Sequence, residues 1–138
     1  MMTRLWRRRR WLPDLAEAIF WLILAGLVLR LLPFRRIAPA LSPPLAPRNP
    51  DPQAVERVIW AVRAAARRLP FAVCFHQGIA AQRMLCRRGL AVSLHYGVAK
   101  AESGIEAHVW AVAEGRTILG GEVADRFTFL TRFDPRSI

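Results

Sequence analysis

The chain has 138 residues, which suffices for one modest hydrophobic core and excludes a protein of several large domains. Apolar residues make up 54% of it and charged residues 22%, which excludes an intrinsically disordered chain. The net charge is +11, and Lys100 is the only lysine among 21 basic residues, so part of the charge reflects coding bias. The remaining positive charge is compatible with an acidic peptide, a membrane surface or nucleic acid as partner.

Residues 1–37 form the first predicted unit, a basic segment followed by an apolar helix. Pro13 and Asp14 are typical of a helix start. Ala18 to Leu29 is an uncharged apolar run of twelve residues. A spanning helix needs about 20 apolar residues, so this length favours a buried or interfacial helix.

A membrane anchor and a signal peptide are the alternatives for residues 14–34. Ala38-Pro39-Ala40 resembles a signal cleavage site. Arg30, Arg35 and Arg36 stand before it, however, where a signal peptide rarely carries charge. We therefore expect a cytoplasmic protein that associates with membranes, if at all, through residues 14–34.

Residues 38–52 contain six prolines and form an extended connector, the predicted boundary before a core of residues 53–138. Asp51 and Pro52 are expected as the N-cap and first residue of the next helix, which Pro70 ends. That helix has an apolar stripe with helical spacing: Val55, Val58, Ile59, Val62, Ala66 and Leu69.

A second amphipathic helix is predicted at Phe75 to Arg88, with Gly89 as its C-terminal cap. Strand-like alternation then follows in four segments, separated by turn signals. They are Leu90–Val98, Glu106–Ala113, Arg116–Leu119 and Arg126–Leu130. The predicted fold class is α+β, with N-terminal helices followed by an antiparallel sheet.

Cys74 stands where an apolar run meets the second amphipathic helix. The unpaired N–H groups and the dipole of a helix N-terminus favour a thiolate, which is the nucleophilic form of cysteine, and can stabilise an oxyanion. Cys86 lies about 18 Å further along the same helix, too far for a disulfide with Cys74. We interpret Cys86 as a core residue, and two unpaired thiols fit a reducing compartment. A free cysteine is usually a small buried hydrophobe, which is the alternative for Cys74.

Three histidines could serve as a base for such a thiolate. His108 lies on the second predicted strand and is the preferred candidate, with His95 on the first strand as the second choice. His76 is two residues from Cys74, and residues so spaced on a helix do not face each other. The Cys74–His76 pair with Cys86 or His108 fits no standard zinc spacing, so we expect no metal and no other cofactor.

A third group usually orients the base and fixes its tautomer. Glu114 precedes a turn glycine and is expected to be solvated. Glu122 and Asp125 follow the Gly120-Gly121 break, which could fold the chain back towards His108. The sequence does not distinguish between these two carboxylates.

Together these segments resemble the stand-alone proteases of lasso-peptide biosynthesis, which are transglutaminase-like leader peptidases with a papain-like arrangement of nucleophile and base. The matching segments are CFHQGIAAQRMLCRRG from Cys74 to Gly89, SLHYGV at 93–98, EAHVW at 106–110 with its Glu-Gly turn, and the lead-in helix that ends in LPFRR. The resemblance covers roughly residues 14–130.

The resemblance implies a cysteine peptidase with Cys74 as nucleophile and His108 as base. Its implied partners are the lasso precursor peptide, cut at the leader–core junction, a small leader-recognition protein, and an ATP-dependent macrolactam synthetase. Related proteins often carry an acidic residue about a dozen positions after the histidine, where this chain has Gly120-Gly121. Glu122 or Asp125 would then complete a triad, or the site would work as a dyad.

Two other functions are compatible with the sequence. One is a non-enzymatic basic protein that binds membranes or nucleic acid. Nucleic-acid binding is disfavoured, because tryptophan and phenylalanine lie mostly in apolar runs and are not regularly interleaved with basic residues. The other is acyl transfer by the same cysteine–histidine pair.

Overall fold

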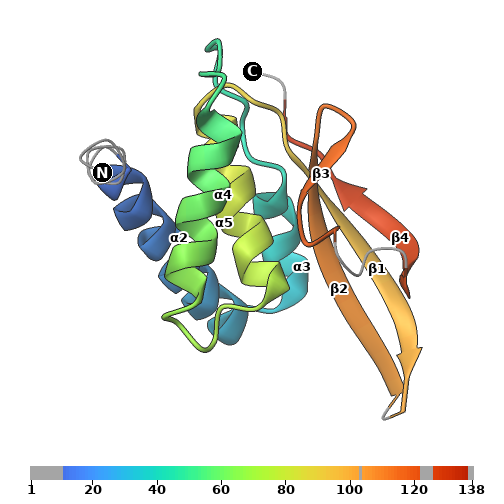
Figure 1. Cartoon of the computed structure of the whole chain (residues 1–138). Coiled ribbons are helices and arrows are strands. Elements are labelled where there is room, and N and C mark those ends of the chain that lie inside the picture. The colour runs from blue at the N-terminus through green and yellow to red at the C-terminus, as the bar shows by residue number, and fades with distance from the viewer. Residues whose placement is uncertain (1–10, 103, 122–125, 137–138) are drawn as a thin grey trace.

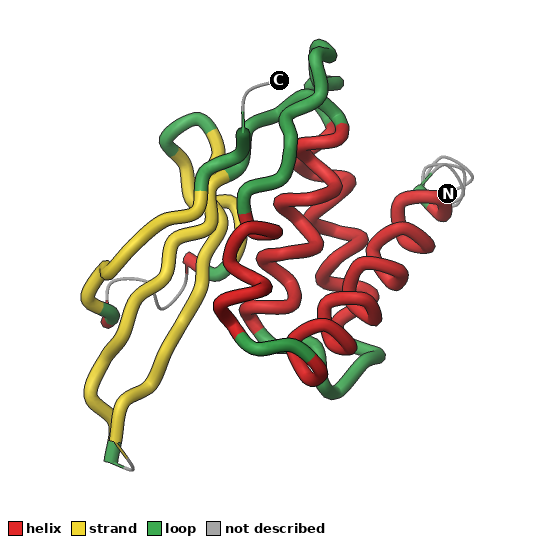
Figure 2. The backbone as a smooth tube through the Cα atoms, turned by 180° about the vertical axis from the view of Figure 1, so that it is seen from behind, coloured by secondary structure: helices red, strands yellow, loops and turns green. Residues whose placement is uncertain are grey.

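The computed structural model describes residues 11–102, 104–121 and 126–136. Its helices form one layer and its four strands form an antiparallel sheet beside it (Figure 1). Seen from behind, the sheet and the helices again occupy opposite sides of the molecule (Figure 2). The fold is therefore α+β, as the sequence predicts.

Within the described residues, five helical segments precede the sheet: α2 (Leu12–Leu31), α3 (Phe34–Ile37), the 3₁₀ helix η1 (Ala38–Leu41), α4 (Ala54–Ala66) and α5 (Cys74–Arg87). α4 and α5 are amphipathic and bury one face each. α2 packs on both of them, at the side of the helical layer that is far from the sheet (Figure 1).

The apolar helix α2 is part of the core through one narrow stripe. Ala18, Leu22 and Ala25 are buried on it, spaced so that they share one face. Asp14 is buried on the same side and accepts hydrogen bonds from Arg57 of α4 and Arg88 of α5. α2 is also long and apolar enough to cross a membrane, by length and composition alone.

The strands are β1 (Ser93–Ala101), β2 (Gly104–Ala113), β3 (Arg116–Leu119) and β4 (Thr128–Phe133). Their order in the sheet is β3-β2-β1-β4, and every pairing is antiparallel. In the β1–β2 pair, Leu94 lies opposite Ala111 and Gly97 opposite His108. Leu94 and Ala111 are fully buried, so their face of the sheet covers the core.

Two details of residues 38–53 differ from the sequence prediction. The proline-rich segment is not extended throughout, because η1 forms at its start; the missing N–H of Pro39 costs nothing in a first helical turn. α4 takes Gln53 as its N-cap instead of Asp51. The Asp51 carboxylate accepts the Gln53 N–H at 2.8 Å, which stabilises the turn before the helix.

Candidate active site

Cys74 is the first residue of α5. The chain turns just before it, where the Ala72 N–H donates to the carbonyl of Leu69 at 3.0 Å, and Val73 is extended. The first N–H groups of a helix have no partner within it, and no N-cap side chain supplies one at this end of α5. The Cys74 thiol is half-buried at this positively polarised end, whose N–H groups can stabilise an oxyanion.

Cys86 lies at the other end of the same helix and is fully buried. Burial raises the pKa of its thiol, which keeps the thiol protonated and unreactive. The interpretation of Cys86 as a core residue therefore agrees with its surroundings, and Cys74 is the more accessible of the two thiols.

His108 lies on β2, and its ring stacks on two aromatic side chains. The ring centroids of Phe127 and Trp110 are 5.1 Å and 6.1 Å away, at interplanar angles of 26° and 21°. Its Nε2 atom lies 2.9 Å from the carbonyl oxygen of Gly120. These three contacts hold the ring in one orientation.

The contact with Gly120 also selects the tautomer of His108. A carbonyl oxygen can only accept a hydrogen bond, so Nε2 must carry the proton and donate it. In the neutral ring the lone pair is then on Nδ1. Nδ1 is therefore the atom of His108 that can take a proton from another group.

The segments that carry Cys74 and His108 lie next to each other. A Cβ atom on Gly78, one turn after Cys74, would lie 3.1 Å from the side chain of Val109, the residue that follows His108. The strand alternates, so the His108 ring belongs to the opposite sheet face, with Trp110. Among the contacts of the described residues, no hydrogen bond joins the Cys74 thiol to this ring. The structure thus juxtaposes the two segments without joining the two side chains.

The other two histidines also contact aromatic rings. His76 packs edge-on against Phe71 with ring centroids 5.8 Å apart, and its buried Nδ1 has no hydrogen-bond partner among the described residues. Burial lowers the pKa of His76. His95, the second-choice base, contacts the rings of Trp110 and Phe129, and burial followed by the charge of Arg132 lowers its pKa.

The two predicted candidates for the orienting carboxylate, Glu122 and Asp125, lie outside the described residues. The orienting contact that the structure does describe comes from the backbone of Gly120, twelve residues after His108. Gly120 has φ of +80°, a conformation that favours glycine. The sequence analysis missed this role, because a backbone carbonyl has no side-chain signature; the Gly-Gly pair was the available signal.

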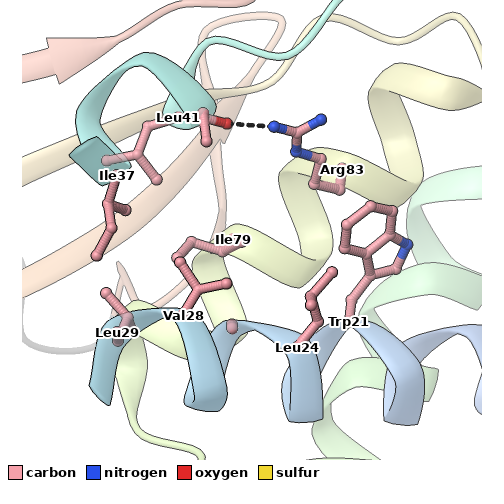
Figure 3. A pocket seen from close by; sticks show the side chains of 10 residues that line it. Trp21, Leu24, Val28, Leu29, Ile37, Leu41, Ile79 and Arg83 are labelled. Atoms are coloured by element: carbon pink, nitrogen blue, oxygen red, sulfur yellow. Dashed lines mark hydrogen bonds between the residues drawn. The ribbon is translucent and has the colours of Figure 1, made fainter. Parts of the chain in front are cut away.

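An apolar pocket of about 270 Å³ lies between α2, α5 and the segment 37–41 (Figure 3). Trp21 and Arg83 form its polar edge, with the guanidinium carbon 5.7 Å from the indole centroid. Arg83 also donates to the carbonyl of Ala40. Neither cysteine lines this pocket, so it is separate from the candidate nucleophile.

Comparison with known proteins gives one match. A family model described as "Transglutaminase-like superfamily" matches residues 19–132, which includes both Cys74 and His108. No curated protein and no solved structure matches the chain significantly.

Proposed function

The chain belongs to the transglutaminase-like superfamily, and on that basis we propose that it is a cysteine peptidase that removes the leader from a ribosomally made lasso-peptide precursor. The superfamily includes cysteine peptidases and acyltransferases. The observation that carries the proposal is the position of Cys74: a half-buried thiol at the uncapped N-terminus of α5, in a chain whose other cysteine is buried.

In this proposal Cys74 is the nucleophile and Nδ1 of His108 is the base. The Nδ1 atom takes the thiol proton while the sulfur attacks the scissile carbonyl carbon. The resulting oxyanion is stabilised by the first-turn N–H groups of α5. The intermediate collapses to a thioester, and the leaving amine takes the proton from His108. Water, deprotonated by His108, then attacks the thioester and restores the thiol.

The mechanism requires the two side chains to meet. Hydrogen bonds between catalytic groups are often long in the free enzyme and tighten only in the complex with substrate. We therefore propose that peptide binding brings the Cys74 sulfur within reach of Nδ1. Val109 packs on Gly78, so the two segments already lie side by side. The His108 ring lies with Trp110 on the sheet face that α5 does not cover, so the proposed movement must bring the Cys74 sulfur to that face. The Gly120 carbonyl would orient His108 in place of a carboxylate, unless Glu122 or Asp125 does so.

The proposed partners follow from the same resemblance. They are the precursor peptide, a small leader-recognition protein that presents it, and the macrolactam synthetase that uses the released core. We place the reaction in the cytoplasm, where unpaired thiols such as Cys74 and Cys86 are stable.

The test uses the purified full-length chain, the precursor peptide and the leader-recognition protein, with products identified by mass spectrometry. Wild type is expected to release the leader. Cys74→Ala should abolish cleavage, His108→Ala should reduce it at least about 100-fold, and Cys86→Ala should retain it. Cleavage by Cys74→Ala would refute the mechanism. If an added amine, and not water, becomes attached to the carbonyl group at the cleavage site, the protein is an acyltransferase.

A further inference from the structure

The outer face of α2 is an apolar stripe with no described protein segment covering it. Phe20 is 57% exposed, Leu27 53% and Leu31 74%, and Ile23 and Leu24 are exposed between them. Their spacing of three, one, three and four residues places them on one side of the helix. We call these five residues the outer stripe; it extends over most of a helix about 30 Å long.

The opposite side of α2 is fixed to the rest of the fold. Ala18, Leu22 and Ala25 are buried there. Asp14 is held by Arg57 and Arg88, each 2.8 Å from one of its two oxygens. Moving α2 across a bilayer would break these ion pairs and expose the core, so a spanning orientation is incompatible with the folded state.

The charges around the outer stripe have one sign only. Residues 18–36 contain no acidic residue and no serine, threonine, asparagine or glutamine. Their three charged residues are Arg30, Arg35 and Arg36, all exposed and without a carboxylate partner among the described residues. The stripe is therefore apolar along its length and cationic at its C-terminal end.

These features fit a lipid surface better than a protein partner. Protein interfaces carry about one hydrogen bond per 100–200 Å², which needs polar side chains, and the five residues of the outer stripe have none. A bilayer requires no such bonds: it takes up apolar side chains at the acyl boundary, and its phosphates attract arginine.

We propose that α2 lies flat in the surface of an anionic bilayer, with the outer stripe immersed and Arg30, Arg35 and Arg36 at the phosphates. This proposal does not depend on the peptidase activity.

Membrane binding would also place the candidate nucleophile at the lipid surface. Phe71 lies against the C-terminal half of α2, because a Cβ on Gly26 would be 2.8 Å from its ring. Phe71 and Val73 are both exposed and immediately precede Cys74. The loop that leads into α5 therefore borders the outer stripe.

The test is co-sedimentation of the full-length protein with vesicles of phosphatidylcholine alone or with 30% phosphatidylglycerol. Wild type is expected to bind the anionic vesicles and to elute in 1 M salt or alkaline carbonate without detergent. Leu27→Asp, at the centre of the stripe, should weaken binding at least about tenfold. The double variant Arg35→Gln/Arg36→Gln should weaken binding to the anionic vesicles, because two basic residues no longer interact with the lipid phosphates.

Matched controls separate this site from general hydrophobicity and charge. Ile105→Asp changes an apolar residue on β2 that is even more exposed than Leu27, 79% against 53%, and Arg116→Gln/Arg126→Gln removes two exposed charges elsewhere. Both should bind like wild type, and circular dichroism should show all variants folded. Three outcomes would overturn the proposal: no binding by wild type, equal binding by Leu27→Asp and Ile105→Asp, or release by detergent only. A dimer that Leu27→Asp dissociates, without vesicle binding, would assign the stripe to a second copy of the chain.

Discussion

Replacement of Asp14 by alanine should strongly destabilise the protein, because this one carboxylate joins three helices. Asp14 is only 2% exposed on α2. One of its oxygens accepts from Nε and Nη2 of Arg57 on α4, at 3.1 Å and 2.8 Å. The other accepts from Nη2 of Arg88, just after α5, at 2.8 Å. The variant loses all three charge-assisted hydrogen bonds.

The size of the loss in unfolding free energy depends on the partners that each arginine retains. Breaking a fully buried ion pair costs about 3–5 kcal/mol. Arg88 retains Glu17 at 3.0 Å, and Arg57 retains Asp51 at 3.7 Å. Both arginine side chains are also partly exposed, 25% and 30%, so water can solvate them. We therefore expect a loss of about 2–4 kcal/mol, a large part of the 5–15 kcal/mol typical of a domain.

Urea denaturation followed by circular dichroism measures this loss. The midpoint should fall by about 1–2 M, given a typical slope of about 2 kcal/mol per molar. Asp134→Ala is the control: it removes an ion pair to Arg132 whose side chains are 48% and 62% exposed, and should cost less than about 1 kcal/mol. If Asp14→Ala costs no more than this control, the reasoning about the buried carboxylate is wrong.

Three further predictions concern the thiols, a glycine and a histidine. Iodoacetamide should modify Cys74 in the native protein and Cys86 only after denaturation, because Cys86 is buried and burial raises its pKa. Mass spectrometry of digests measures the two alkylation rates, and equal rates in the native protein would contradict the prediction. Gly89→Ala should lower the free energy of unfolding by at least about 2 kcal/mol, because φ is +91° and a Cβ would collide with a backbone carbonyl. Gly115→Ala is the control: φ is +75° there but the space is open, so the loss should be about 1 kcal/mol. Burial lowers the pKa of His76, so the unfolded chain binds a proton more readily than the folded one, and the free energy of unfolding falls as pH drops from 7.5 to 5.5. His76→Leu should reduce that fall. If the fall is unchanged, His76 is not its source.

The elements of the fold could be predicted largely from periodicity. Alternation in residues 90–98 separates Leu94 from His95, and the structure buries the first against α5 while leaving the second on the outer face. The transition from an apolar run to a helical pattern places Cys74 at a helix start, as observed. Such local patterns are visible in sequence because each residue's environment repeats along the element.

The long-range contacts could not be predicted in this way. Asp14 is 43 residues from Arg57 and 74 from Arg88, and nothing local distinguishes these two arginines from the others in the chain. The contact that fixes the His108 tautomer comes from the backbone of Gly120, and a backbone carbonyl has no side-chain signature in the sequence.

The ion pairs at the C-terminal end of α5 have a consequence for its other end. Arg87 and Arg88 are anchored to Glu17 and Asp14 of α2, whereas Cys74 lies 14 residues away, at the start of the same helix. A helix is stiff along its axis, so an anchor at one end fixes the axial position of the other, about 20 Å distant. The four residues of these ion pairs, although remote from the thiol, would therefore determine its position. Replacing them would change the turnover rate as well as the stability.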